Sequence, residues 1–226
     1  PANETFCRRT TSEFVFVALL QRKGLERRYR LEAVEGLAKI HSTDPLTELL
    51  NGMVELDKKG EASEPVLRDL SPLLQQSKPE ALSAKRDSLL KLANESQLGF
   101  TRQIACAAVV TADGSGERRW KEVDSNPSQL ADLLLSLSFI RDPNIRAALH
   151  PKVEPLIHKA DPAEVRRAAI MALPAVPGHD AESFAALAAF VKSGTERESA
   201  IAGLQKIPRK SWPVGEAESL IESLVA

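Results

Sequence analysis

The chain has 226 residues, with 30 Lys and Arg against 31 Asp and Glu, so its net charge is −1. A general nucleic-acid or anionic-membrane binder normally carries a strong basic excess, and a base-stacking surface needs more aromatics than seven Phe, two Trp and one Tyr. No apolar run approaches the roughly 18 residues of a membrane span, so we expect a soluble chain without a membrane partner. Because the first residue is Pro1, we also expect a segment of a longer protein.

The apolar residues follow a helical period along the whole chain. A strand would need an alternating run of β-branched or aromatic residues, and the one β-branched cluster, at 109–111, ends an alanine-rich stretch. In chain order, the pattern predicts short helices over about 11–22, 29–40, 44–57, 64–76, 79–93, 101–112, 116–123, 127–140, 143–158, 165–176, 180–192, 196–207 and 216–225.

Many of the fourteen prolines mark helix starts. Proline costs nothing at the first helical position, where its missing N–H would have no partner, and Asp or Asn before it can cap the helix. This arrangement predicts helix starts at Asp44-Pro45, Asn126-Pro127, Asp142-Pro143 and Asp161-Pro162.

Four of the expected helices repeat one pattern. Segments 29–40, 101–112, 165–176 and 196–207 superimpose without gaps. Their fifth, eighth, ninth and twelfth positions form one helix face, which we expect to pack against neighbouring helices. The fifth position is always alanine, at Ala33, Ala105, Ala169 and Ala200. The second is always arginine, at Arg30, Arg102, Arg166 and Arg197, and we expect these arginines to be structural and to bond carboxylates or carbonyls.

The residues at 161–173, DPAEVRRAAIMAL, resemble the second-helix signature of HEAT repeats, and 142–146 echoes them. The resemblance implies an all-α fold, a right-handed α-solenoid of about six HEAT-like helix pairs with a C-terminal orphan helix, as one domain over residues 1–226. It also implies that Arg166 and its equivalents bond within or between repeats, for example to Asp161.

A narrower likeness rests on 4–11, 30–39, 44–47, 149–156 and 211–213. These residues are similar to the HEAT region of large exported bacterial proteins that carry a dehydrogenase-like propeller and a c-type haem domain. The likeness implies an exported connector; without it we expect a cytoplasmic protein. The haem attachment motif is absent, so no cofactor is expected.

Side chains able to do chemistry are few. The four histidines are interpreted as surface or capping residues, since His150 and His158, eight apart, are poorly placed for joint metal ligation. Cys106 lies in an apolar stretch and is expected to be a buried thiol, whereas Cys7, beside two arginines, would be activated only if exposed. We therefore predict no catalytic, metal or cofactor residues.

The most promising functional surface lies at the third, seventh and tenth positions of the repeated helices. These positions point away from the packing face and carry little charge, and the candidate protein-binding residues are Gln103, Ala107, Val110, Arg167 and Met171. Two interpretations remain open: the strip contacts a partner, or these helices are buried on all sides.

Together these features favour a non-catalytic HEAT-like scaffold or interdomain connector. Its partner would be another protein or a flanking domain of the same chain, and nucleic acid and small molecules are disfavoured. The alternative is a DNA glycosylase-like solenoid enzyme, which by resemblance would line its groove with basic and aromatic residues.

Overall fold

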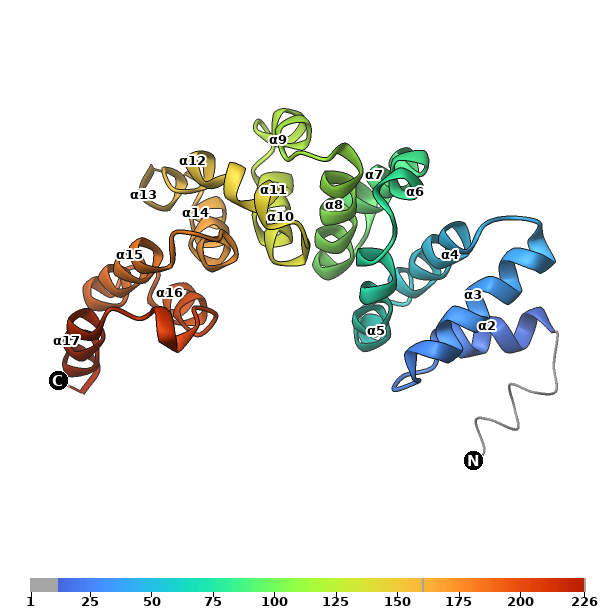
Figure 1. Ribbon diagram of the computed structural model, residues 1–226, viewed down its shortest axis with the longest axis horizontal. Coiled ribbons are helices and arrows are strands. Elements are labelled where there is room, and N and C mark those ends of the chain that lie inside the picture. Colours follow the sequence, from blue (N-terminus) through green and yellow to red (C-terminus); the bar gives the residue numbers. More distant parts are fainter. Residues whose placement is uncertain (1–11, 160, 226) are drawn as a thin grey trace. The chain divides into compact units, whose positions relative to one another are not determined.

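The computed structural model describes residues 12–159 and 161–225, and within these ranges the chain forms helices, turns and bends and no strand. The chain divides into two compact units, the first ending at Asp113 and the second beginning at Gly114. Each unit is described by itself, with helices labelled as in Figure 1.

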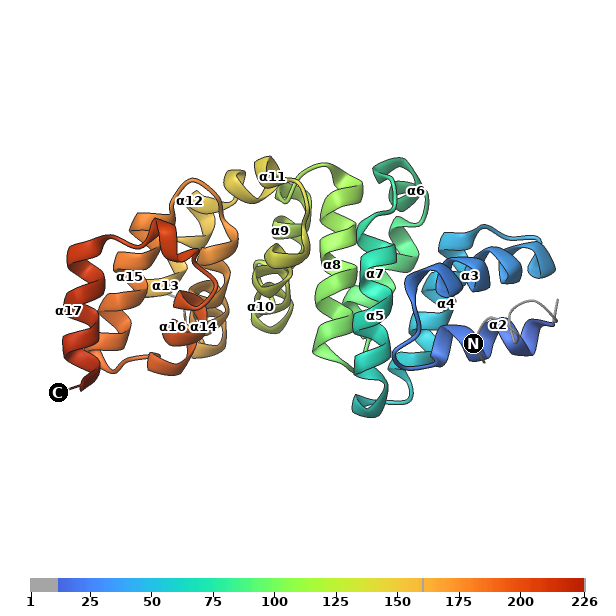
Figure 2. The ribbon, with the colours of Figure 1, turned by 60° about the horizontal axis from the view of Figure 1, so that its bottom comes forward.

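The first unit is built from helices that each pack on the one before or after. They are α2 (Glu13–Gln21), α3 (Arg27–His41), α4 (Pro45–Asp57), η1 (Glu61–Ser63), α5 (Glu64–Gln75), α6 (Pro79–Ala84), α7 (Arg86–Glu95) and α8 (Gly99–Asp113). Helix α2 packs on α3, α3 on α4 and α4 on α5, while α8 contacts α5, α6 and α7. Figure 2 shows α5, α7 and α8 side by side. The single helix predicted over 79–93 is two helices, interrupted at Lys85.

The second unit contains α9 (Glu117–Val123), α10 (Pro127–Ser136), η2 (Leu137–Phe139), α11 (Pro143–Ala148), α12 (His150–Val153), α13 (Leu156–Lys159), α14 (Ala163–Ala172), η3 (Leu173–Ala175), α15 (Asp180–Ser193), α16 (Arg197–Leu204), η4 (Arg209–Ser211) and α17 (Val214–Val225). Helix α14 packs on α10, α13 and α16, and α15 packs on α16 and α17. Three short helices replace the one predicted over 143–158, because Pro151 and Pro155 lack the N–H that a continuous helix needs.

Three of the four predicted capping residues cap their helices. Asp44, Asn126 and Asp142 accept backbone N–H bonds at 2.9, 3.2 and 2.8 Å. The prediction is wrong at Asp161, because α14 begins at Ala163 with Pro162 as its N-cap and receives no side-chain cap. At the other three positions, Asp or Asn directly before proline therefore predicts the helix start correctly.

The packing face of the repeated helices is buried at the fifth and ninth positions. All four fifth-position alanines are fully buried, and so are the four residues at the ninth position, Leu37, Val109, Leu173 and Leu204. The twelfth position is less uniform, since Ile40 is 43% exposed while Val176 and Ile207 are buried. The repeated alanines thus lie where helices approach most closely, as small side chains permit.

Candidate functional site

The strip expected to form an open surface is closed over α8. Ala107 is 2% exposed and Val110 is fully buried, so the expectation that they line an open groove is wrong. Small or apolar residues cover almost every side of α8 from Ile104 to Val110, and α5, α6 and α7 pack on it. For this helix, burial on all sides is the correct interpretation.

The other three residues of the strip are more accessible. Gln103, in the first unit, and Met171, in the second, are half-buried, and Arg167 is exposed. Nη1 of Arg167 lies 3.8 Å from a carboxylate oxygen of Glu196, and because the Arg167 side chain is 52% exposed, this long ion pair contributes little stability. As binding residues these three stay a prediction.

Arg30 is the most deeply buried of the repeated arginines. Its guanidinium donates to the carbonyl oxygens of Leu20 and Arg22, both at 2.7 Å, and to Asp69 Oδ2 at 2.9 Å. Burial lowers the pKa of this guanidinium, and the Asp69 carboxylate acts in the opposite direction. Arg30 therefore joins α3 to the turn after α2 and to α5, which is a structural role.

The remaining repeated arginines differ from one another. Arg102 donates to the carbonyls of Ser96 and Gln97, just before α8. Arg166 donates to Glu196 Oε1 at 2.9 Å, rather than to Asp161 as the HEAT resemblance implied. Arg197 is exposed and makes no bond to another described residue, so the structural prediction is wrong at this position. The second position of the repeat therefore does not by itself give an arginine a bonding partner.

A hollow in the first unit lies between α4 and α7, and we call it the α4–α7 groove. Its volume is about 530 Å³. One face of each helix lines it, through Thr47, Leu50, Asn51, Val54, Asp57 and Lys58 on α4 and Lys85, Ser88, Lys91, Leu92 and Glu95 on or beside α7, with Ser96 and Gln97 at one end. The repeated pattern gives no signal for this groove, because neither α4 nor α7 is one of the four repeated helices.

Hydrogen bonds hold the walls of the groove in place. The buried Asp57 carboxylate accepts the backbone N–H groups of Gln97 at 2.7 Å and Leu98 at 3.1 Å, and so joins the end of α4 to the start of α8. Lys85 Nζ lies 2.8 Å from Asp44, and this contact lowers the pKa of Asp44 to about 2. Ammonium and carboxylate groups are therefore paired along the rim.

A second cluster in the first unit centres on His41. Its Nδ1 lies 3.1 Å from Glu48 and its Nε2 lies 3.3 Å from Glu13. The Glu48 side chain is buried, and its other oxygen accepts the Thr43 hydroxyl at 2.6 Å. The pKa of His41 is raised, chiefly by its hydrogen bond to Glu48. The cluster borders a smaller hollow of about 180 Å³ between α2 and α4.

The second unit holds a pair of stacked histidines. The rings of His150 and His179 have centroids 3.6 Å apart and planes 9° apart. The pKa of His150 is lowered, mainly by burial and then by the charge of His179. The sequence spacing had suggested His158 as the neighbour to consider for His150. His158 instead packs beside Phe190, with ring centroids 5.8 Å apart. The pairing joins α12 to the turn before α15, which local spacing cannot reveal.

Among the described residues, the remaining metal-binding or nucleophilic side chains do not cluster into a site. Over residues 12–159 and 161–225, no three His, Cys, Asp or Glu side chains are grouped to hold a metal ion. Cys106 is buried, as expected, and Cys7 lies outside the described residues. Among the helices that the structure describes, none is both long and apolar enough to span a bilayer.

Comparison with known proteins gives no match to any family model, curated protein or solved structure.

Proposed function

We propose that the chain is a non-catalytic scaffold of HEAT-like helix pairs that holds another protein or a flanking domain. In this proposal the helix pairs stack into a right-handed solenoid of about six pairs, which forms one domain over residues 1–226. Its support is the recurrence of buried alanines at one register, together with the bonds of Arg30 and Arg166 between neighbouring helices.

The observation that carries the binding role is the α4–α7 groove. The half-buried Val54 provides apolar surface in it, the buried Leu50 and Leu92 lie beneath, and hydroxyl, amide and charged groups surround them. Apolar surface with a polar rim is typical of protein contact sites. Asp57 already bonds the α4 wall to Gln97 and Leu98, so this part of the groove would lose little further freedom when a protein segment binds.

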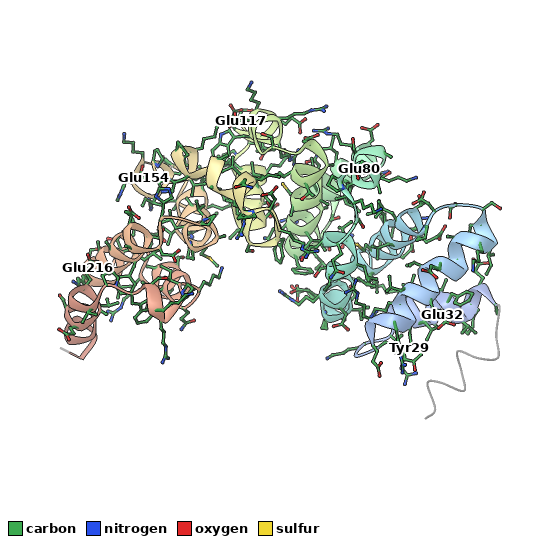
Figure 3. The ribbon with its side chains drawn as sticks, in the orientation of Figure 1. Tyr29, Glu32, Glu80, Glu117, Glu154 and Glu216 are labelled. Atoms are coloured by element: carbon green, nitrogen blue, oxygen red, sulfur yellow. The ribbon has the colours of Figure 1, made fainter. Side chains whose placement is uncertain are left out.

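Site-specific photocrosslinking tests this role. A benzoyl-phenylalanine at Asn51 or Ser88 faces the groove, whereas the matched control positions Lys39 and Glu80 are exposed in the same unit outside it. Figure 3 labels Glu80 at the edge of the ribbon. We expect protein adducts from Asn51 and Ser88 and none from the controls.

Two results would overturn the proposal. The first is equal or absent crosslinking at groove and control positions. The second is tight binding of duplex DNA that weakens steeply with salt, which would favour the DNA glycosylase-like alternative.

A further inference from the structure

The two units place histidines in opposite electrostatic surroundings: His41 of the first unit is exposed, and His150 and His179 of the second are half-buried. In the first unit, His41 lies between the carboxylates of Glu13 on α2 and Glu48 on α4, and each ring nitrogen faces one of them. Two carboxylates stabilise the protonated ring by Coulomb attraction and by charge-assisted hydrogen bonds. The protonated His41 therefore ties α3 to both neighbouring helices.

In the second unit, the neighbour of a histidine is another histidine. His150 and His179 stack in parallel with ring centroids 3.6 Å apart, so two positive charges would face each other at contact distance. Other charges near the pair are the exposed carboxylates of Glu154 and Glu182, and Glu182 lies 3.9 Å from Nδ1 of His179. Figure 3 shows Glu154 at the α12–α13 side of this unit. Lys152 of α12 is engaged elsewhere, with Glu117 at 2.9 Å.

We propose that the chain carries a pH-sensitive device in which acidification strengthens the α2–α3–α4 contact of the first unit and loosens the contact between α12 and the turn before α15 in the second. Histidine is the side chain that changes charge between about pH 5 and 8, so the response falls in that interval. This inference is independent of the proposed scaffold role, because it concerns contacts inside each unit.

The pKa directions agree with the geometry in both units. The pKa of His41 is raised in the folded chain, so its contribution is complete below the unfolded value and is lost as the pH rises through the folded value. The pKa of His150 is lowered, so its contribution is complete above the unfolded value and is lost as the pH falls through the folded value. The two contributions therefore have opposite signs.

The two tryptophans allow the second unit to be observed in the full chain. Trp120 lies in α9, and Trp212 packs 5.1 Å from Phe184 of α15, so tryptophan emission reports on the second unit. Hydrogen exchange of α3 and α4 amides, corrected for the intrinsic pH dependence of exchange, reports on the first. On lowering the pH from about 8 to about 5.5, we expect exchange in α12 and early α15 to rise on the order of threefold or more, and exchange in α3 to fall. We also expect the midpoint of urea unfolding, monitored by tryptophan emission, to shift to a lower urea concentration.

Variants assign each response to its histidines. His179→Phe keeps a ring in the stack but cannot be protonated there, so the part of the pH response caused by repulsion between two charged rings should disappear. His150→Phe removes the titrating ring itself, so with this variant the pH response of the second unit should largely disappear. His158→Phe, in the same unit but beside Phe190, is the matched control and should keep the response. His41→Gln should abolish the opposite response in α3.

Three results would overturn the proposal. They are exchange that changes in the same direction in both units, a response in the second unit that survives His179→Phe and His150→Phe, and a response lost equally in His158→Phe.

Discussion

The Asp69 carboxylate on α5 accepts a 2.9 Å hydrogen bond from Nη2 of Arg30, whose side chain on α3 is completely buried. The same guanidinium satisfies the carbonyls of Leu20 and Arg22. Arg30→Met would remove all these donors, so we expect the free energy of unfolding to fall by about 3–5 kcal/mol. Arg30→Lys should recover only part of this loss, because an ammonium group lacks the planar guanidinium that donates to two carbonyls and to Asp69 at once.

Urea titration followed by circular dichroism measures the change at Arg30. The matched control is Arg197→Met, at the same repeat position but exposed, which should stay within about 0.5 kcal/mol of the parent chain. Equal losses at the two arginines would contradict a special structural role for Arg30.

Two helical glycines should respond to alanine in opposite ways. A Cβ on Gly36 would lie 2.4 Å from the Phe16 ring, so Gly36→Ala should destabilise the chain by about 1–3 kcal/mol. A Cβ on Gly52 would meet only Leu20 Cδ1, at 3.4 Å, so Gly52→Ala should stabilise by up to about 1 kcal/mol through helix propensity. Thermal unfolding of both variants checks the signs, and Phe16→Leu should rescue Gly36→Ala.

The repeated alanines leave no room for larger side chains. Ala105 and Ala169 are fully buried, so Ala105→Leu and Ala169→Leu should each lower the free energy of unfolding by about 1–3 kcal/mol. Lys39→Gln, exposed on α3, is the control and should change it by less than about 0.5 kcal/mol. Denaturant midpoints compare the three variants, and equal midpoints would mean that the repeat register is wrong.

Asp44 should make part of the stability of the first unit depend on acid. The Lys85 ammonium, together with the bonds to Thr47, lowers its pKa to about 2. Its charge therefore stabilises the fold above the unfolded value of about 3.9 and ceases to do so as the pH falls toward 2. Asp44→Asn keeps an N-cap acceptor and removes the charge.

We expect Asp44→Asn to cost about 0.5–1 kcal/mol near neutral pH, a small value because the Asp44 side chain is 48% exposed. Urea unfolding of parent and variant at a series of pH values measures the difference. The difference should shrink steadily between about pH 4 and pH 2. A difference that stays constant over this range would show that the Asp44 charge does not contribute.

The sequence by itself determined the helical character of the chain, most of the helices and their starts, and the buried fifth position. Asp44, Asn126 and Asp142 cap their helices because capping joins residues two or three apart. Ala33, Ala105, Ala169 and Ala200 are buried because a helical period places them on one face. Capping and helical periodicity both act within one helix, so the amino-acid sequence alone contains the information that they require.

The tertiary structure alone decided which helices meet and which side chains they bring together. It paired Arg166 with Glu196 instead of Asp161, and His150 with His179 instead of His158. It also covered Ala107 and Val110 and left the α4–α7 groove open. These outcomes depend on the angles and distances between packed helices, which side-chain volumes from many parts of the chain determine jointly and no single helical period specifies.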